Sequence, residues 1–208
     1  MKHVIGWFSC SLLLAACGGG AAGSPAPETP EAPPAAEPTP QDSAPAEVDE
    51  SAAGDKPAEA TGPIEVTIES RSGSTLTGTA TFEETSDGVQ VMIRVGNTNA
   101  GLKATHIHEK GDCSDPEAKS AGDHFNPDGH NHGIPPDEKR HLGDLGNLGI
   151  NPAGTGQLTI MVAGANLKPG DPHSFLDRAI IIHEKKDTGG QPSGNAGKRI
   201  GCGVIKRS

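Results

Sequence analysis

The sequence lacks the signatures of several large classes of protein. No segment of ten or more residues has a helical apolar period, which argues against a helical fold. No basic patch of nucleic-acid type is present, since residues 63–208 carry fifteen Lys and Arg against eighteen Asp and Glu. The apolar run near the N-terminus is too short to span a bilayer. We therefore expect neither a nucleic-acid partner nor a transmembrane helix.

The N-terminal residues have the pattern of a secretory signal peptide. A short basic start precedes an apolar run over residues 4–16. The run Leu-Ala-Ala-Cys-Gly that ends at Gly18 resembles the lipobox of bacterial lipoproteins, in which the leader is cut before a cysteine that is then acylated. This predicts a signal peptide over residues 1–16, a lipid on Cys17 and a location in the cell envelope. Gly18 in place of aspartate favours the outer membrane, on its periplasmic or surface side. The alternative is an ordinary signal peptide cleaved after Ala16.

Residues 18–62 have the composition of a disordered tether. They consist mostly of Ala, Pro, Glu, Thr and Ser, so they cannot bury enough apolar surface to fold. They also carry nine acidic residues against Lys56, and so hold most of the formal net charge of −10. We expect a lipidated cysteine and tether over residues 17–62, followed by a folded domain over 63–208.

The cysteines predict one disulfide bond. Of the four, Cys10 leaves with the leader and Cys17 takes the lipid, so Cys113 and Cys202 remain in the folded domain. Disulfides persist in secreted domains, and we predict that these two cysteines are bonded.

From residue 63 the apolar residues alternate with polar ones, as in β-strands. Strict alternation predicts strands over 64–69, 75–82 and 89–95, with turns at 71–74 and 84–88. Five further strands are expected over 102–108, 144–150, 156–163, 178–183 and 199–205. Eight short strands with glycine-rich turns predict an all-β, antiparallel Greek-key sandwich or flattened barrel.

Two predicted loops, 109–142 and 184–198, are long enough to suggest a function. Both adjoin histidines, and residues 104–149 hold six of the nine histidines of the chain. Histidine is the commonest metal ligand among side chains, so this stretch predicts a metal site.

The spacing of these histidines suggests ligand sets. His106 and His108 lie two apart on a strand and therefore face the same side, although two polar residues on a solvated face would give the same pattern. His183 follows an apolar run and could simply end a strand. Three further histidines and one aspartate supply three nitrogens and a carboxylate, which form a closed set suited to zinc: His124, His132, His141 and Asp144.

Six motifs in order then resemble the copper/zinc superoxide dismutase family over about residues 64–206. They are His106-x-His108, the run Gly-Asp-His-Phe-Asn-Pro around His124, His132-Gly, His141-x-Gly-Asp-Leu-Gly, His183-Glu-Lys, and Gly-Asn-Ala-Gly-Lys-Arg up to Arg199 followed by Cys202-Gly. Cys113 lies five residues after His108, which is similar to bacterial members. The 184–198 loop is short for the family.

The resemblance implies a site with two metal ions. Copper would be bound by His106, His108, His124 and His183, and zinc by His124, His132, His141 and Asp144, with His124 shared. The implied reaction is disproportionation of superoxide to oxygen and hydrogen peroxide by copper redox cycling. The bridging His124 would carry a proton, and Arg199 would hold the superoxide anion. Asp187 matches the aspartate that links a copper histidine to a zinc histidine.

A rival interpretation is a lipid-anchored protein that sequesters copper or zinc without turnover. It would use the same ligands, but all the implied ligands and Arg199 are present here, which favours the enzyme. His130 is interpreted as a solvated loop residue, and His173 matches a structural position of the family. Family members are monomers or homodimers, and the sequence does not select between these.

Overall fold

The structure is a computed structural model that describes residues 62–207. The predicted signal peptide, the lipid on Cys17 and the tether up to residue 61 lie outside the described residues, so these assignments stay predictions. Among the described residues, no helix is long and apolar enough to cross a membrane.

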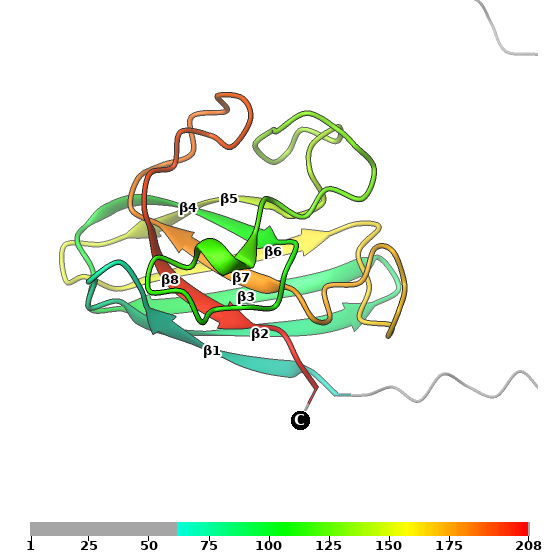
Figure 1. The fold of residues 1–208 in the computed structure, drawn as a ribbon, viewed down its shortest axis with the longest axis horizontal. Helices are drawn as coiled ribbons and strands as arrows, with labels where there is room; N and C mark the ends of the chain where they lie inside the picture. Colours follow the sequence, from blue (N-terminus) through cyan, green and yellow to red (C-terminus); the bar gives the residue numbers. More distant parts are fainter. Residues whose placement is uncertain (1–61, 208) are drawn as a thin grey trace, which may run out of the picture. The chain divides into compact units, whose positions relative to one another are not determined.

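Eight antiparallel strands close into a barrel, which confirms the predicted fold class (Figure 1). The strands are β1 (Ile64–Ser70), β2 (Thr77–Thr85), β3 (Gly88–Gly96), β4 (Gly101–His108), β5 (Asp144–Ile150), β6 (Gly156–Val162), β7 (Ala179–His183) and β8 (Arg199–Val204). Each lies within a few residues of its predicted bounds. The predicted turn over 84–88 is wrong in length, because Thr85 and Gly88 pair across the hairpin and leave only two residues to turn.

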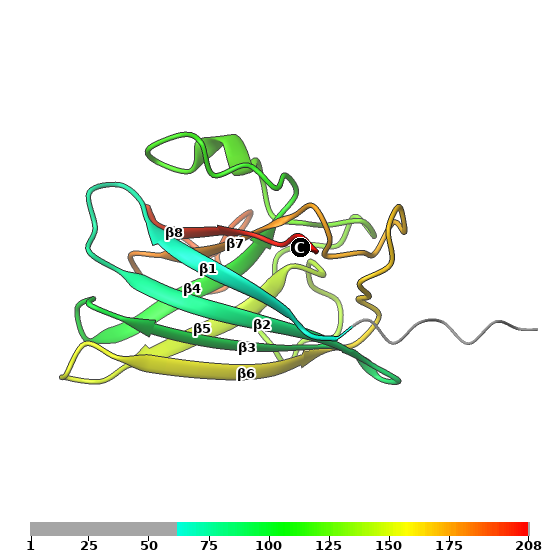
Figure 2. The same cartoon turned by 90° about the horizontal axis from the view of Figure 1, so that it is seen from below.

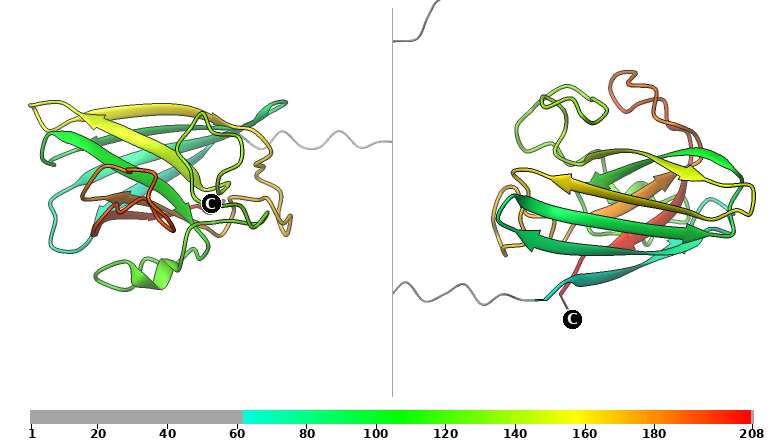
Figure 3. Two further views of the ribbon diagram at one scale, coloured as in Figure 1. Left: turned by 90° about the horizontal axis from the view of Figure 1, so that it is seen from above. Right: turned by 180° about the vertical axis from the view of Figure 1, so that it is seen from behind.

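The strands run around the barrel in the order β1-β2-β3-β6-β5-β4-β7-β8, and β1 pairs with β8 to close it. Figure 2 shows β1, β2, β3 and β6 side by side along one face. The Greek-key crossings place β4 between β5 and β7, although these three strands are far apart in the sequence. Because β4 and β7 are antiparallel, the loops that follow them leave opposite ends of this pair. Both loops nevertheless reach over the same outer side of the barrel (Figure 3).

Strand β7 is buried on both of its faces. Ile180 and Ile182 point into the main barrel core, while Ile181 packs on the outside with Ala118, Ala121 and Cys202. Apolar side chains buried in this way each contribute about 1.5 to 3 kcal/mol. The loop after β4 thus covers the outer face of β7, which explains why this strand is apolar throughout rather than alternating.

The predicted disulfide between Cys113 and Cys202 is confirmed, with a Cα–Cα distance of 5.9 Å. It ties the loop after β4 to strand β8. The same loop contains a short 3₁₀ turn, η1 (Lys119–Ala121). The covalent bond and the apolar contacts together hold the loop against the barrel.

Candidate metal centre

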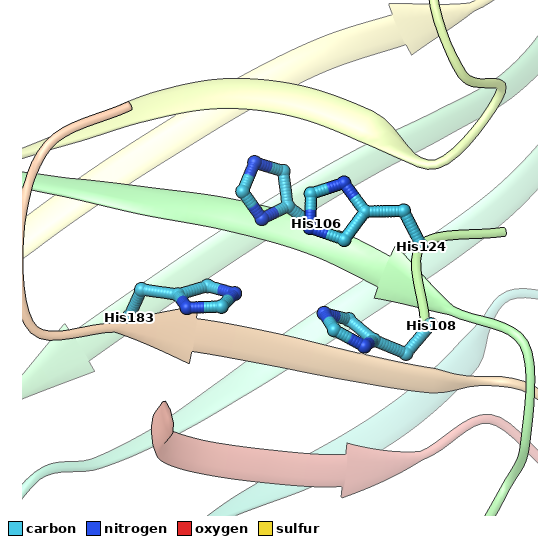
Figure 4. A group of neighbouring side chains, drawn as sticks. All are labelled: His106, His108, His124 and His183. Carbon is cyan, nitrogen blue, oxygen red and sulfur yellow. The ribbon is translucent and has the colours of Figure 1, made fainter. Parts of the chain in front are cut away.

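Four histidine rings converge over the antiparallel pair of strands β4 and β7 (Figure 4). His106 and His108 are on β4 and His183 ends β7, whereas His124 comes from the long loop and pairs with His108 through an isolated β-bridge. All four are buried, and each offers a nitrogen that lies within 4.8 Å of the other three. The structure therefore brings together every residue predicted to bind copper.

Two register shifts in the strand pairing of the barrel orient these side chains. The pairing of β7 with β8 shifts between Ile182 and His183, so His183 lies opposite Arg199. The pairing of β4 with β5 shifts between Thr105 and His106, where His106 lies opposite Asp144. Such bulges re-aim side chains next to functional sites.

Two of the rings are oriented by a backbone carbonyl at one nitrogen. His108 Nδ1 lies 2.9 Å from the carbonyl oxygen of Gly122, and His183 Nδ1 lies 3.3 Å from that of Gly197. A ring N–H that donates to a carbonyl leaves the opposite nitrogen with a free lone pair. Both rings are thus held in the tautomer that presents Nε2 as a ligand atom.

The inward-facing nitrogens of this group have no hydrogen-bond partner within the described part of the chain. They are His106 Nδ1, His108 Nε2, His124 Nε2 and His183 Nε2, and all are buried. Buried polar atoms are normally paired, because leaving one unsatisfied costs about 1 to 3 kcal/mol. Four such nitrogens facing one another fit the shell of one metal ion.

Burial also favours the neutral form of three rings of this group. It lowers the pKa of His106 to about 4, and it lowers the pKa of His108 and of His183 well below the usual histidine value. A metal ion binds the neutral imidazole, so the electrostatic environment favours ligation at neutral pH.

A second compact group overlaps the first. It consists of His106, His124, His132 and Asp144, whose ligand atoms also lie within 4.8 Å of one another. The predicted zinc set had His141 in place of His106. The structure places His141 at the edge of this group, with Nδ1 3.3 Å from Asp144 Oδ1 and 3.4 Å from His124 Nδ1. His106 enters the compact group because its ring lies against that of His124, with ring centroids 3.9 Å apart.

Asp144 supplies the carboxylate of the second group. Its Oδ1 lies 2.9 Å from His124 Nδ1, and its Oδ2 lies 3.0 Å from His132 Nδ1. Burial alone would raise the pKa of this carboxyl, but hydrogen bonds from His124 and His132 hold the pKa well below its usual value. Asp144 is therefore ionised, as a metal ligand must be.

His124 faces both groups. Its Nδ1 contacts Asp144 in the second group, while its Nε2 is one of the four inward-facing nitrogens of the first. The structure thus places this ring where a bridging ligand would lie.

Asp187 links a histidine of the first group to one of the second. Its Oδ2 lies 2.9 Å from His106 Nε2, and its Oδ1 lies 2.9 Å from His132 Nε2. Burial would lower the pKa of His132, but hydrogen bonds with Asp144 and Asp187 raise it to about 9. A cation at His132 Nδ1 would take the place of the proton that these carboxylates favour.

Arg199 is a fixed cation beside the four-histidine group. Its Nη1 donates to the carbonyl oxygen of Ala118 and its Nη2 to that of Gly122, both at 2.7 Å. The guanidinium lines a cavity of about 490 Å³ that is also lined by His108, His124 and His183. The cavity would admit a small anion to the space between the cation and the rings of His108, His124 and His183.

The comparison with known families agrees with this geometry. A family model described as copper/zinc superoxide dismutase (SODC) matches residues 76–205. The chain belongs to the copper/zinc superoxide dismutase family.

Several solved structures of superoxide dismutase type are similar to this chain. The clock protein EA4 is 34% identical over 71% of this chain and 95% of its own, with a TM-score of 0.64. A SOD-like protein from Bacillus subtilis is 34% identical over 68% of this chain and 97% of its own, with a TM-score of 0.61. A double mutant of that protein, in which a tyrosine and a proline are changed to histidine, is 35% identical over 69% and 97%, with a TM-score of 0.62.

Two contacts of this superoxide dismutase fold were missed by the sequence reasoning. Gln191 binds the backbone of His132 on both sides: its Oε1 accepts from the His132 amide at 3.0 Å and its Nε2 donates to the His132 carbonyl at 2.8 Å. Ser72, in the turn after β1, donates from Oγ to the Arg199 carbonyl at 2.8 Å. Neither residue belongs to a motif, and the only available signal was the length of the 184–198 loop.

Proposed function

We propose that this chain is a superoxide dismutase. Copper would be bound by His106, His108, His124 and His183, and zinc by His124, His132, His141 and Asp144. The observation that carries the proposal is the set of four inward-facing, buried ring nitrogens next to a cavity that contains Arg199. A site that only stored metal would have no use for a cation held at the mouth of that cavity.

The proposed reaction converts two superoxide anions and two protons into one oxygen and one hydrogen peroxide. Bound copper would supply the one-electron redox chemistry, and bound zinc would fix His124 and Asp144. Arg199 attracts and orients the anion through a guanidinium that two backbone carbonyls hold in place. His124 Nε2 faces the same cavity and can take up a proton and pass it to the reduced oxygen species.

The second candidate is a metal-binding protein without turnover. It is favoured by the solved relatives, which are described as a clock protein and as a SOD-like protein rather than as enzymes. Such a protein would bind the same metals through the same side chains, so only turnover separates the two candidates.

The substitution His183→Ala tests the copper assignment. It removes one of the four convergent nitrogens, so the copper- and zinc-loaded variant should lose superoxide turnover down to the uncatalysed rate. Superoxide decay is followed in the loaded wild-type chain, in the variant and in Asp87→Ala, an exposed control in the turn between β2 and β3. Unchanged turnover in His183→Ala would contradict the assignment.

We further propose that a lipid on Cys17 holds the domain in the cell envelope. The support is the lipobox-like run that ends at Gly18 and the acidic tether that follows it. Both would deliver the metal centre to a compartment in which the bond between Cys113 and Cys202 persists.

A further inference from the structure

Two histidines of the described residues belong neither to the two compact groups nor to the predicted zinc set. His130 is in the long loop after β4, and His173 is in the connection from β6 to β7. Together with Asp128 and Glu138 they line a separate cavity of about 220 Å³. These four side chains are the types that bind zinc and copper ions.

The contacts of this cavity orient its metal-binding side chains. His173 Nε2 lies 2.9 Å from Asp128 Oδ1, and the two side chains are 38% and 42% exposed. His130 Nδ1 lies 3.1 Å from the carbonyl oxygen of Arg140, which orients the ring and leaves Nε2 as a lone-pair donor. The Asn126 side chain fixes the His130 backbone, because its Nδ2 donates to the His130 carbonyl at 2.9 Å and its Oδ1 accepts from the His130 amide at 3.0 Å.

We propose that His130, His173, Asp128 and Glu138 form an exposed site for a divalent cation of the zinc class. His173 Nε2 and Asp128 Oδ1 lie 2.9 Å apart. A small rotation of these side chains, toward the separation of about 3.3 Å found in a tetrahedral shell, would let both atoms bind one ion. The cation replaces the proton that these two atoms share. His130 Nε2 and the Glu138 carboxylate complete the shell.

This site differs from the buried groups in its preorganisation. In the described residues, only the two buried groups have all their ligand atoms within 4.8 Å of one another. His130 and Glu138 are exposed and must turn toward the His173–Asp128 pair, which costs side-chain entropy. The exposed site therefore binds its cation more weakly than the buried groups and exchanges it faster.

The position of the exposed site next to His141 suggests what its cation does. His141 lines this cavity and also the larger cavity beside Arg199, so one ring separates the two. A cation held at the exposed site is thus next to a predicted zinc ligand. We infer that the exposed site captures zinc for the buried centre; this loading role rests on the zinc assignment under the proposed function, whereas the exposed site itself does not.

The exposed site is tested by titrating Zn²⁺ into the full chain after both buried groups have been filled with copper and zinc. Calorimetry should show one further equivalent of zinc. The double variant His130→Gln/His173→Gln should bind it at least about tenfold more weakly. Glu83→Gln, an exposed carboxylate on β2, is the matched control and should bind as the wild type does.

A single substitution controls for the possibility that the double variant loses zinc because it misfolds. Glu138 makes no hydrogen bond or ion pair with the described residues in the structure, so Glu138→Gln removes a ligand without removing a structural contact. Glu138→Gln should also bind the additional zinc ion more weakly than the wild type does. Absence of that equivalent in the wild type, or its survival in the double variant, would overturn the exposed site.

The loading role has its own readout. Zinc uptake by the metal-free chain should be several-fold slower in the double variant, with the same final zinc content in the buried centre. Equal uptake rates would overturn the loading role. A failure of superoxide turnover would affect only the proposed function, because the further zinc equivalent is measured without superoxide.

Discussion

At the scale of single residues, one backbone carbonyl couples the candidate anion site to the candidate copper site. The carbonyl oxygen of Gly122 accepts from Arg199 Nη2 at 2.7 Å and lies 2.9 Å from His108 Nδ1. The cation and a candidate copper ligand are therefore positioned by the same atom, and a shift of the loop at Gly122 would move both.

Arg199→Ala should separate anion attraction from metal binding. Copper and zinc contents should stay at the wild-type level, because the guanidinium contacts two carbonyls and no member of either ligand group. Superoxide turnover should fall at least about tenfold, and its dependence on ionic strength should weaken, since a charge that attracts the anion has been removed. Turnover is measured over a range of salt concentrations.

The matched control for this variant is Arg94→Ala, an exposed arginine on β3 that bonds Gln157. It should leave both turnover and salt dependence unchanged. If Arg199→Ala lost its metal ions instead, the arginine would be a structural residue and its assignment to the anion would be wrong.

The sequence could predict which residues belong to the metal centre where their spacing and their chemistry agree. His106 and His108 face one side because they are two apart on a strand, and the structure brings both to the four-histidine group. The membership of the second group could not be predicted in the same way. The ring centroids of His106 and His141 lie 5.6 and 5.5 Å from that of His132, so which ring turns a nitrogen toward the group depends on ring orientations that the sequence does not encode locally.

At the scale of elements, the 184–198 loop positions histidines of the metal centre through hydrogen bonds. It supplies Asp187 to two rings, Gly197 to His183 and Gln191 to the backbone of His132. Its length alone predicted a functional loop. Its contacts could not be predicted, because they depend on how two loops from distant parts of the sequence meet over the barrel (Figure 1).

Gln191→Ala should weaken zinc retention without removing a ligand. The substitution deletes both hydrogen bonds to the His132 backbone, at a cost of about 1 kcal/mol in this partly exposed position, which corresponds to roughly a fivefold loss of zinc affinity. Zinc release to a chelating dye is followed in the variant and in Ser193→Ala, an exposed control in the same loop. Identical release from the two variants would show that Gln191 does not position His132.

The strands themselves were predictable, and their irregularities were not. Period-two alternation marks a strand because one face is buried, and all eight predicted strands are present. The register shifts at His106 and at His183 do not change the apolar pattern of the strands that carry them. These shifts nevertheless decide which side chains face the centre, so the orientation of the ligands could be seen only in the structure.

At the scale of the whole molecule, the centre depends on closure of the barrel. His106 and Arg199 are separated by most of the domain, yet the strand order places β4, β7 and β8 next to one another. Strand order cannot be obtained from periodicity, because many orders bury the same faces. Here it was available only through the resemblance to the superoxide dismutase family.

The predicted lipid anchor is tested on the whole chain. Cys17→Ser removes the only proposed acylation site, so the variant should move from the membrane fraction to the soluble fraction. The wild type and Cys10→Ser, whose cysteine lies in the predicted leader, should remain with the membranes. Recovery of the wild type in the soluble fraction would contradict the anchor and favour an ordinary signal peptide.

The central claim is that two adjacent metal ions in this barrel turn over superoxide. The most direct measurement is the copper and zinc content of the purified full chain, taken together with its rate of superoxide decay. We predict one copper and one zinc per chain and a decay rate far above the uncatalysed one. A chain that binds both metals and leaves the decay rate unchanged would contradict the claim and identify a metal-binding protein.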